Sequence, residues 1–211
     1  MVTVTELTEN YLRGHPSIKD CLKNNVVNYS KLARRIARHI SPEKKSSVEA
    51  VLIACRRFAA KLKNEGVREE GIVRILRNGE LEVKNKIVVA IIGKKTLRLE
   101  SLIALEKKTR DEGGVFYAIE GPKVFTIIMS EKNFDDLNAF KKSTLRLSKN
   151  LAMVTIKNSE EVEKTPGFIA YLYSLLGENN INVVETMSCW TDTIIVISEE
   201  DLARTIKFLK F

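Results

Sequence analysis

TIIMSEKNFDDL (residues 126–137) and IIVISEEDLARTI (residues 194–206) are two similar stretches of one 211-residue chain. Each begins with a run of apolar residues, passes through a serine, Ser130 or Ser198, and continues with acidic residues and a helical spacing of apolar side chains. Serine is favoured at the start of a helix because its hydroxyl accepts a hydrogen bond from a backbone N–H. The sequence therefore predicts, twice, an apolar strand followed by a serine-capped helix.

The segments around these two stretches repeat one order of elements: strand, helix, strand, strand, helix. The expected strands cover residues 87–93, 114–120, 123–130, 151–157, 181–190 and 192–198, and the expected helices cover residues 98–111, 131–142, 167–178 and 199–209. A βαββα unit of about 60 residues is half of a ferredoxin-like fold. The predicted class is therefore α+β, with two tandem units. No strand is expected after residue 209, so another segment or a partner chain must complete the second sheet.

The second unit carries two short motifs on either side of its first helix. Lys164-Thr165-Pro166-Gly167 precedes the helix, and GENNINVVETMS (residues 177–188) follows it. On these residues the unit resembles the ACT family of small-molecule-sensing domains. In that family a glycine in this loop lets the backbone approach a ligand, commonly an amino acid bound between units paired side by side. The resemblance implies a ligand site formed by Thr165, Pro166, Gly167 and Asn182.

The same residues have simpler explanations. Pro166 can be the first residue of an ordinary helix, and an asparagine such as Asn182 often only makes the turn after a helix. Trp190 is a candidate pocket wall, with core or interface burial as the alternative. In the first unit, GKKTLRL (residues 93–99) replaces the proline–glycine turn. We therefore place the expected ligand site in the second unit.

NYSKLARRIARHI (residues 28–40) predicts a helix whose two faces differ. Apolar residues recur at every fourth position on one face, while the opposite face carries four cations: Lys31, Arg34, Arg35 and Arg38. Residues 29–40 include no acid, so the i, i+4 pairs that would neutralise these charges are missing. The alternative is an ordinary solvated face.

Positive charge is concentrated in one segment of the chain. Residues 31–63 hold 10 basic and 2 acidic residues, a net charge of +8, which equals the net charge of the whole chain. Such asymmetry indicates a polyanionic partner, and lysine and arginine contacts to phosphates would position a nucleic acid. The candidate nucleic-acid-binding residues are Lys31, Arg34, Arg35, Arg38, Lys44, Lys45, Ser47, Arg56, Arg57 and Lys61.

The elements around the basic helix resemble a winged helix-turn-helix domain. Ser46-x-x-Glu49 is a capping box that opens another helix through about residue 63, and Asn78-Gly79 predicts a β-hairpin, the wing, over residues 72–87. Two features depart from that family: the turn of about six residues between the helices is longer than usual, and Val48-Glu49-Ala50-Val51 is poor in groove-reading side chains. The expected domains are residues 1–85 (winged-helix-like), 86–148 (first ACT-like unit) and 149–211 (second ACT-like unit).

Other classes find little support in the sequence. Three scattered cysteines and two isolated histidines have no metal-ligand spacing, so we expect reduced thiols in a cytoplasmic protein and no metal. The chain has no GxxxxGK[ST], HExxH or GxSxG motif. We expect neither an enzyme nor a cofactor. No apolar run reaches the roughly 20 residues of a membrane span, and the N-terminus does not resemble a signal peptide.

These observations lead to two hypotheses. The first is a transcriptional regulator, expected to be a homodimer, that couples binding of an amino acid or another small metabolite at the ACT-like units to DNA binding by the basic domain. The second is an ACT-type regulatory subunit that acts through protein–protein contacts, without nucleic acid. In that case the basic face would meet an acidic protein surface.

Overall fold

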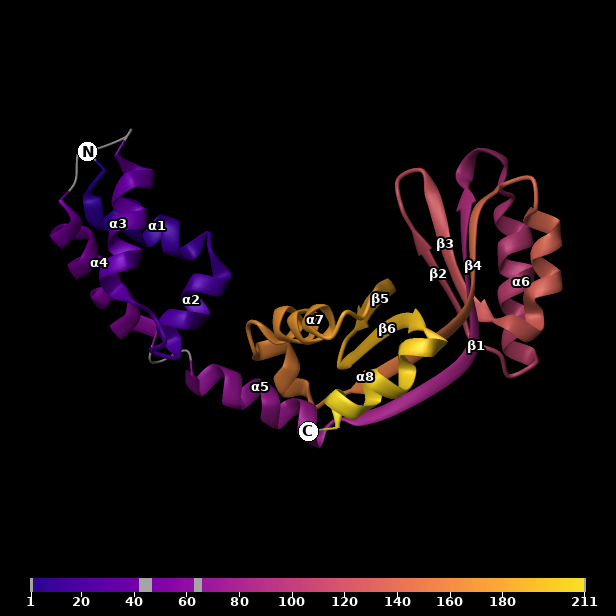
Figure 1. Ribbon diagram of the computed structural model, residues 1–211. Coiled ribbons are helices and arrows are strands. Elements are labelled where there is room, and N and C mark those ends of the chain that lie inside the picture. The colour runs from indigo at the N-terminus through magenta and orange to yellow at the C-terminus, as the bar shows by residue number, and fades with distance from the viewer. Residues whose placement is uncertain (1, 42–46, 63–65, 211) are drawn as a thin grey trace. The chain divides into compact units, whose positions relative to one another are not determined.

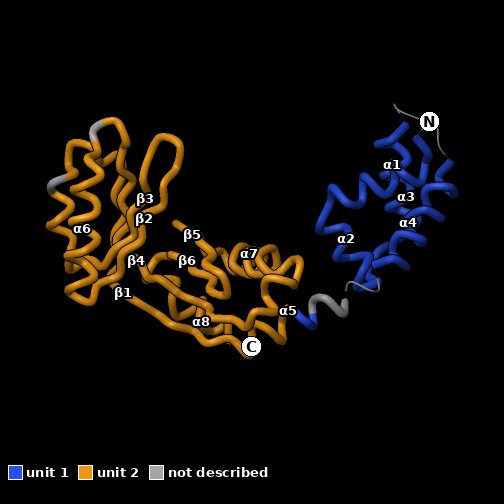
Figure 2. Tube along the Cα trace, turned by 180° about the vertical axis from the view of Figure 1, so that it is seen from behind, with its two compact units in different colours: residues 1–71 blue, residues 72–211 orange. Residues whose placement is uncertain are grey.

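The computed structural model describes residues 2–41, 47–62 and 66–210 of the chain. The chain divides into two compact units, residues 1–71 and residues 72–211 (Figure 2). The first is entirely helical in its described part, and the second contains one antiparallel sheet. Among the described helices, none combines the length and the apolar character that a membrane crossing requires.

The helical unit is built from four amphipathic helices: α1 (Val4–Arg13), α2 (Pro16–Lys23), α3 (Tyr29–Ile40) and α4 (Val48–Leu62). The helix expected over residues 29–40 is confirmed, and the Asn28 side chain caps it by accepting the Lys31 N–H at 3.0 Å. At the start of α4 the Ser47 hydroxyl accepts the Ala50 N–H at 3.1 Å. The expected capping residue Ser46 lies outside the described residues.

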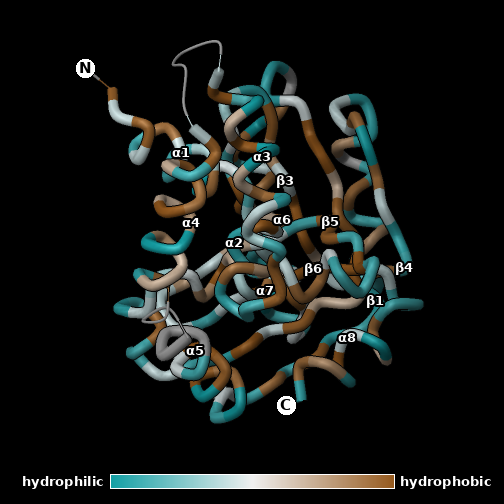
Figure 3. The backbone as a smooth tube through the Cα atoms, turned by 60° about the vertical axis from the view of Figure 1, so that its left-hand side comes forward, coloured by the Kyte–Doolittle hydropathy of each residue, from teal (hydrophilic) through white to brown (hydrophobic). Residues whose placement is uncertain are grey.

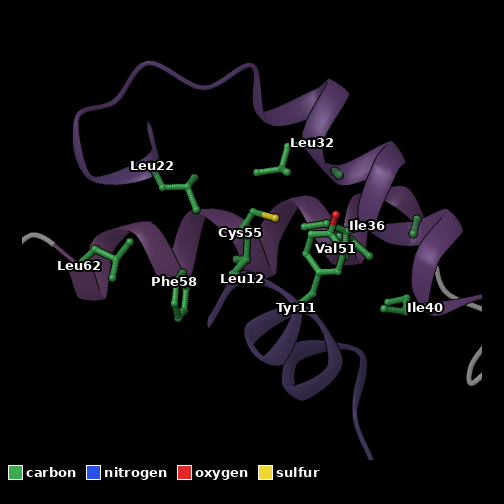
Figure 4. Close-up of a cluster of buried hydrophobic side chains, with 12 residues drawn as sticks. Tyr11, Leu12, Leu22, Leu32, Ile36, Ile40, Val51, Cys55, Phe58 and Leu62 are labelled. Carbon is green, nitrogen blue, oxygen red and sulfur yellow. The ribbon is translucent and has the colours of Figure 1, made fainter. Parts of the chain in front are cut away.

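One hydrophobic core holds this unit together. Leu12 of α1, Ile36 of α3, and Val51, Cys55 and Phe58 of α4 are at most 1% exposed and form its centre (Figure 4). Hydrophobic and hydrophilic residues both occur along α1 and α4, as expected of helices with one buried face (Figure 3). Burial raises the pKa of the Cys55 thiol to about 11, so this cysteine behaves as a packed apolar group.

The second unit is a six-stranded antiparallel sheet in the order β2-β3-β1-β4-β6-β5 (Figure 1). The strands are β1 (Glu80–Gly93), β2 (Phe116–Glu120), β3 (Val124–Ser130), β4 (Thr144–Lys157), β5 (Val183–Cys189) and β6 (Asp192–Ser198). Its helices are α5 (Gly66–Asn78), whose first residues up to Gly71 belong to the first unit, α6 (Leu99–Asp111), α7 (Phe168–Glu178) and α8 (Leu202–Leu209). The 3₁₀ segments are Lys94–Thr96, Glu131–Phe140, Glu160–Lys164 and Glu199–Asp201. The α+β class and the ferredoxin-like order of elements are confirmed. The helix expected over residues 131–142 is a 3₁₀ segment instead.

Two long strands, β1 and β4, serve both ferredoxin-like halves. Residues 87–93 of β1 pair with β3 on one side and with the start of β4 on the other, which gives the first half the strand order β2-β3-β1-β4. In the second half, β4 pairs with β6 over residues 151–157 and with residues 80–84 of β1. The first part of β1 is therefore the strand that the second unit lacked at its C-terminal end. The expected boundary between residues 148 and 149 falls inside β4.

The expected winged helix-turn-helix hairpin over residues 72–87 is wrong. Residues 66–78 form α5, Gly79 follows its last turn with its N–H donating to the Leu76 carbonyl, and β1 begins at Glu80. Ile72, Ile75 and Leu76 have helical spacing and are buried against α7 and the sheet. Asn78-Gly79 therefore ends a helix, a position that also favours glycine. Residues 72–85, assigned in sequence to the basic domain, belong to the sheet unit.

The repeated serines have different roles. The Ser198 hydroxyl accepts the Glu200 N–H at 3.4 Å, at the start of the following 3₁₀ turn, as the sequence predicts. Ser130 does not cap: its hydroxyl accepts the Val115 N–H at 2.8 Å, at the start of the neighbouring strand. The duplication is still visible in the register, because Ile87 pairs with Ser130 and Leu151 pairs with Ser198.

Replacement of Leu76 by alanine tests the role of α5. Leu76 is 4% exposed in the core of the second ferredoxin-like half. We expect Leu76→Ala to lower the free energy of unfolding by about 2–4 kcal/mol, because it leaves a cavity under the sheet. The neighbouring Arg77→Ala, at an exposed position, is the control and should change stability by less than about 0.5 kcal/mol in urea unfolding. Equal effects would contradict the packing of α5 on this sheet.

Candidate functional site

The four cations of α3 share one exposed face of the helical unit. Lys31, Arg34, Arg35 and Arg38 are all exposed, and the residues on the opposite face of the helix are buried in the core: Leu32, Ala33, Ile36, Ala37 and Ile40. The four cations have no ion pair with any described residue. The described part of α3 therefore presents one exposed basic face.

The other candidate nucleic-acid-binding residues do not form one set. Arg56 and Arg57 are exposed on α4, whereas Ser47 caps that helix. Lys61 lies 2.5 Å from Glu9 of α1, so its charge is balanced within the unit. Lys44 and Lys45 lie outside the described residues. The part of the basic surface that the structure describes thus consists of α3 with Arg56 and Arg57.

The loop that leads into α7 has a backbone conformation that favours glycine at the N-cap of the helix. Gly167 adopts φ +95°, a left-handed conformation in which other residues are strained, and Pro166 precedes it in the turn. The Phe168 N–H donates to the Thr165 carbonyl at 3.4 Å across the Thr165–Phe168 turn, a pattern typical of a type II turn. Pro166 therefore precedes the N-cap and is not the first helical residue.

A pocket of about 480 Å³ opens beside this turn. Thr165 and Gly167 line it together with Ile169 and Ala170 of the first turn of α7, whose amides have no intrahelical acceptor. Polar side chains on its other walls come from Glu163, Ser188 and Thr193, and the last wall is Trp190, which is 64% exposed. The site therefore offers backbone donors, a carboxylate and an aromatic surface around one cavity.

Sequence patterns identified only part of this pocket. Of the residues proposed from sequence, Thr165 and Gly167 line the pocket. Trp190 also lines the pocket and is not part of the core. Glu163, Ser188 and Thr193 were missed, because their neighbourhood depends on the end of β5 lying near the end of β4, both of which flank β6. The nearness of strand ends in a sheet is a topological fact that no local motif encodes.

Asn182 lies away from the pocket. It is exposed just before β5, whose first residue pairs with Ile197, whereas the pocket residues Ser188 and Trp190 are at the other end of that strand. Strand residues rise about 3.3 Å each, so a separation of six residues is about 20 Å. Within one chain, Asn182 therefore does not share a cavity with Gly167.

The described residues hold no cluster of three or more histidine, cysteine, aspartate or glutamate side chains that could bind a metal. The one carboxyl on β5, Glu185, has a pKa that burial raises, opposed by the charge of Arg146. It does not line the pocket at the start of α7.

Comparison with known proteins supports the fold. No family model matches the sequence, and no curated protein matches it either. Among solved structures, aspartate kinase of Clostridium acetobutylicum is 15% identical, with a TM-score of 0.51, over 62% of this chain and 33% of the kinase. The regulatory subunit of aspartate kinase from Thermus thermophilus is 10% identical, with a TM-score of 0.49, over 64% of this chain and 95% of the subunit. The chain thus spans about a third of the length of the first kinase. At such identity the first match shows a shared α+β fold, in agreement with the ACT-like resemblance of the sequence.

Alanine substitutions at two glycines of the second unit should change its stability in opposite directions. At Gly167 an added Cβ would meet only Ile72 Cδ1 at 3.7 Å, so the cost of Gly167→Ala comes from the backbone and should be about 1–2 kcal/mol. At Gly177, inside α7, nothing lies within 4 Å, and Gly177→Ala should stabilise by about 0.5–1 kcal/mol. Thermal unfolding of both variants checks the sign. A Gly167→Ala variant as stable as the unsubstituted protein would contradict the left-handed conformation of this turn.

Proposed function

We propose that this chain is a ligand-responsive regulatory protein. In this proposal its second ACT-like unit binds a small zwitterionic metabolite of the amino-acid class, and its helical unit passes the response on through contact with a partner protein. The pocket at the start of α7 is the ligand site, and the basic face of α3 is part of the partner surface. This places the protein-contact hypothesis ahead of the DNA-binding one.

The observation that carries the proposal is that groups suited to opposite charges line one pocket. The free amides at the start of α7, with the positive end of the helix dipole behind them, suit a carboxylate. Glu163 lines the same pocket, has no ion pair with a described residue and suits an ammonium group. Trp190 adds an apolar wall for a side chain. An α-amino acid presents these three features together.

Two further observations agree with this assignment. The sequence resemblance to ACT domains places ligand-binding residues at Thr165, Pro166 and Gly167, which form the turn beside the pocket. The Clostridium aspartate kinase is described as an important allosteric enzyme for industrial amino acids production. A regulatory role for the same fold in this chain follows as a proposal, because fold alone does not define function.

A homodimer gives Asn182 a place in the proposal. β5 is an edge strand, with β6 on one side only. Two copies paired antiparallel along β5 by a twofold axis would bring the start of one strand beside the end of the other. Asn182 of the partner subunit would then approach the Ser188 and Trp190 wall, which completes the predicted set of ligand residues between two chains.

Ligand titration tests the site directly, because Trp190 is the one tryptophan of the chain. We expect one of the twenty amino acids to change Trp190 fluorescence and to raise the melting temperature, since a ligand that binds only the native state stabilises it. Glu163→Gln should weaken that ligand at least about tenfold through loss of a charged partner.

The matched control for this experiment is Glu160→Gln, which removes an acid from the same 3₁₀ segment but does not line the pocket. It should leave the affinity unchanged. A screen in which no amino acid alters the fluorescence or the melting temperature would refute the proposed ligand class.

DNA binding by the helical unit is the second candidate, and the four exposed cations on one face of α3 favour it. Because each neutralised phosphate releases counterions, log affinity for a 20-base-pair duplex should fall with log salt by about 0.9 per contact. Arg34→Ala should reduce that slope by about one, whereas Arg204→Ala, a cation bound to Asp201 in the other unit, should not. A slope near zero, or pull-down partners that survive nuclease treatment, would exclude DNA as the main partner.

A further inference from the structure

A groove of about 650 Å³ lies along one side of α3, between that helix, α2 and the connection that joins them. Its floor is apolar and consists of Ile18, Val26, Val27 and Leu32. Val26 is 71% exposed, Ile18 and Val27 are partly exposed and Leu32 is 8% exposed, so the apolar surface reaches solvent chiefly at Val26. An exposed apolar surface within a polar rim is a common feature of interaction sites.

Among the described residues, the charged ones that line the groove are all cations: Lys31, Arg35 and Arg38. None of them has an ion pair with a described residue. The fourth cation of α3, Arg34, lines a different and smaller hollow, together with Val48 and Ile53. The basic face of α3 is therefore divided: three cations border the apolar groove, and one lies outside it.

The apolar floor and the cationic rim together indicate which kind of partner fits the groove. A nucleic acid backbone would satisfy the cations but leave the apolar floor without a partner, and a neutral apolar peptide would do the reverse. We propose that the groove binds an acidic amphipathic segment of a partner protein, with apolar side chains on the floor and carboxylates beside Lys31, Arg35 and Arg38. This inference rests on the protein-contact part of the proposed function and not on ligand binding.

Apolar and charged contacts have different roles in such an interface. Exposed ion pairs contribute little affinity each, because water screens them and the long side chains lose freedom. Side chains buried on the floor supply most of the affinity, as in other complexes that place a helix in a groove. The cations set the approach rate and the orientation of the segment. A peptide that tests this groove therefore needs both apolar and acidic side chains.

The chain contains its own reporter for this groove. Cys21 lines the groove and is exposed, and Cys189 is exposed in the sheet unit, whereas buried Cys55 has a pKa near 11 and alkylates slowly. The probe is an acetylated 16-residue peptide with leucines at i, i+3, i+4 and i+7, four glutamates beside the leucine stripe, and alanines elsewhere to favour a helix. We expect it to slow alkylation of Cys21 in the full chain by about tenfold, with Cys189 unchanged as the internal reference.

Two substitutions on one helix test specificity. Arg35→Glu should weaken the peptide at least about tenfold, whereas Arg34→Glu, an equal charge change outside the groove, should weaken it less than about threefold. Val26→Asp should also weaken binding. Because Val26 is exposed, the unit should stay folded in this variant, which unchanged thermal unfolding verifies.

Several results would overturn the inference: no protection of Cys21, equal protection by a peptide of the same composition with its leucines scattered, or equal effects of Arg34→Glu and Arg35→Glu. Protection of Cys21 by a DNA duplex but not by the peptide would also overturn it, in favour of a nucleic acid. The Trp190 titration is independent of all these readouts. Failure of the amino-acid ligand and failure of the groove are therefore distinguishable.

Discussion

Both halves of the sheet depend on the antiparallel pairing of β1 with β4. These two strands are the central pair of the six-stranded sheet, and each strand takes part in both halves (Figure 1). At the point where one half passes into the other, Lys86 and Asn150 have left-handed φ angles of 53° and 56°, and the register shifts between Lys84 and Ile87. Such irregularities bend strands and increase their twist. The pairing therefore joins the two ferredoxin-like halves into a single sheet.

This arrangement explains which parts of the fold could be predicted from sequence. Strand patterns and the repeat of Ser130 and Ser198 are local, so the two βαββα units were recognisable. Asn78-Gly79 was ambiguous, because the same dipeptide suits a tight hairpin and the end of a helix. The choice is made by tertiary structure: the second half has an open position beside β4, and a strand preceded by a helix fills it.

The candidate sites show the same division between local and long-range information. Helical periodicity placed Lys31, Arg34, Arg35 and Arg38 on one exposed face, and that arrangement is present in the structure. Periodicity could not reveal that Lys61 is paired with Glu9 from a helix 52 residues away. It also could not show that Val26 and Val27 border the same groove as three of the cations. A connection between helices has no period, and its position follows only from the packing of the helices that it joins.

In the proposed function, α5 is the element that would pass the effect of a ligand at the α7 pocket to the rest of the chain. The helix spans the division between the two compact units, with Gly66–Gly71 assigned to the first and Ile72 onward to the second. Ile72 is buried in the core that contains α7 and lies close to the Gly167 turn. A ligand changes an equilibrium only if it binds two states with different affinity. Closely packed side chains change between discrete arrangements and do not deform smoothly. A shift of the Gly167 turn would therefore either be resisted by Ile72 or move Ile72, and α5 with it. The proposed sensing and the completion of the sheet thus involve the same helix, because α5 lies immediately before β1.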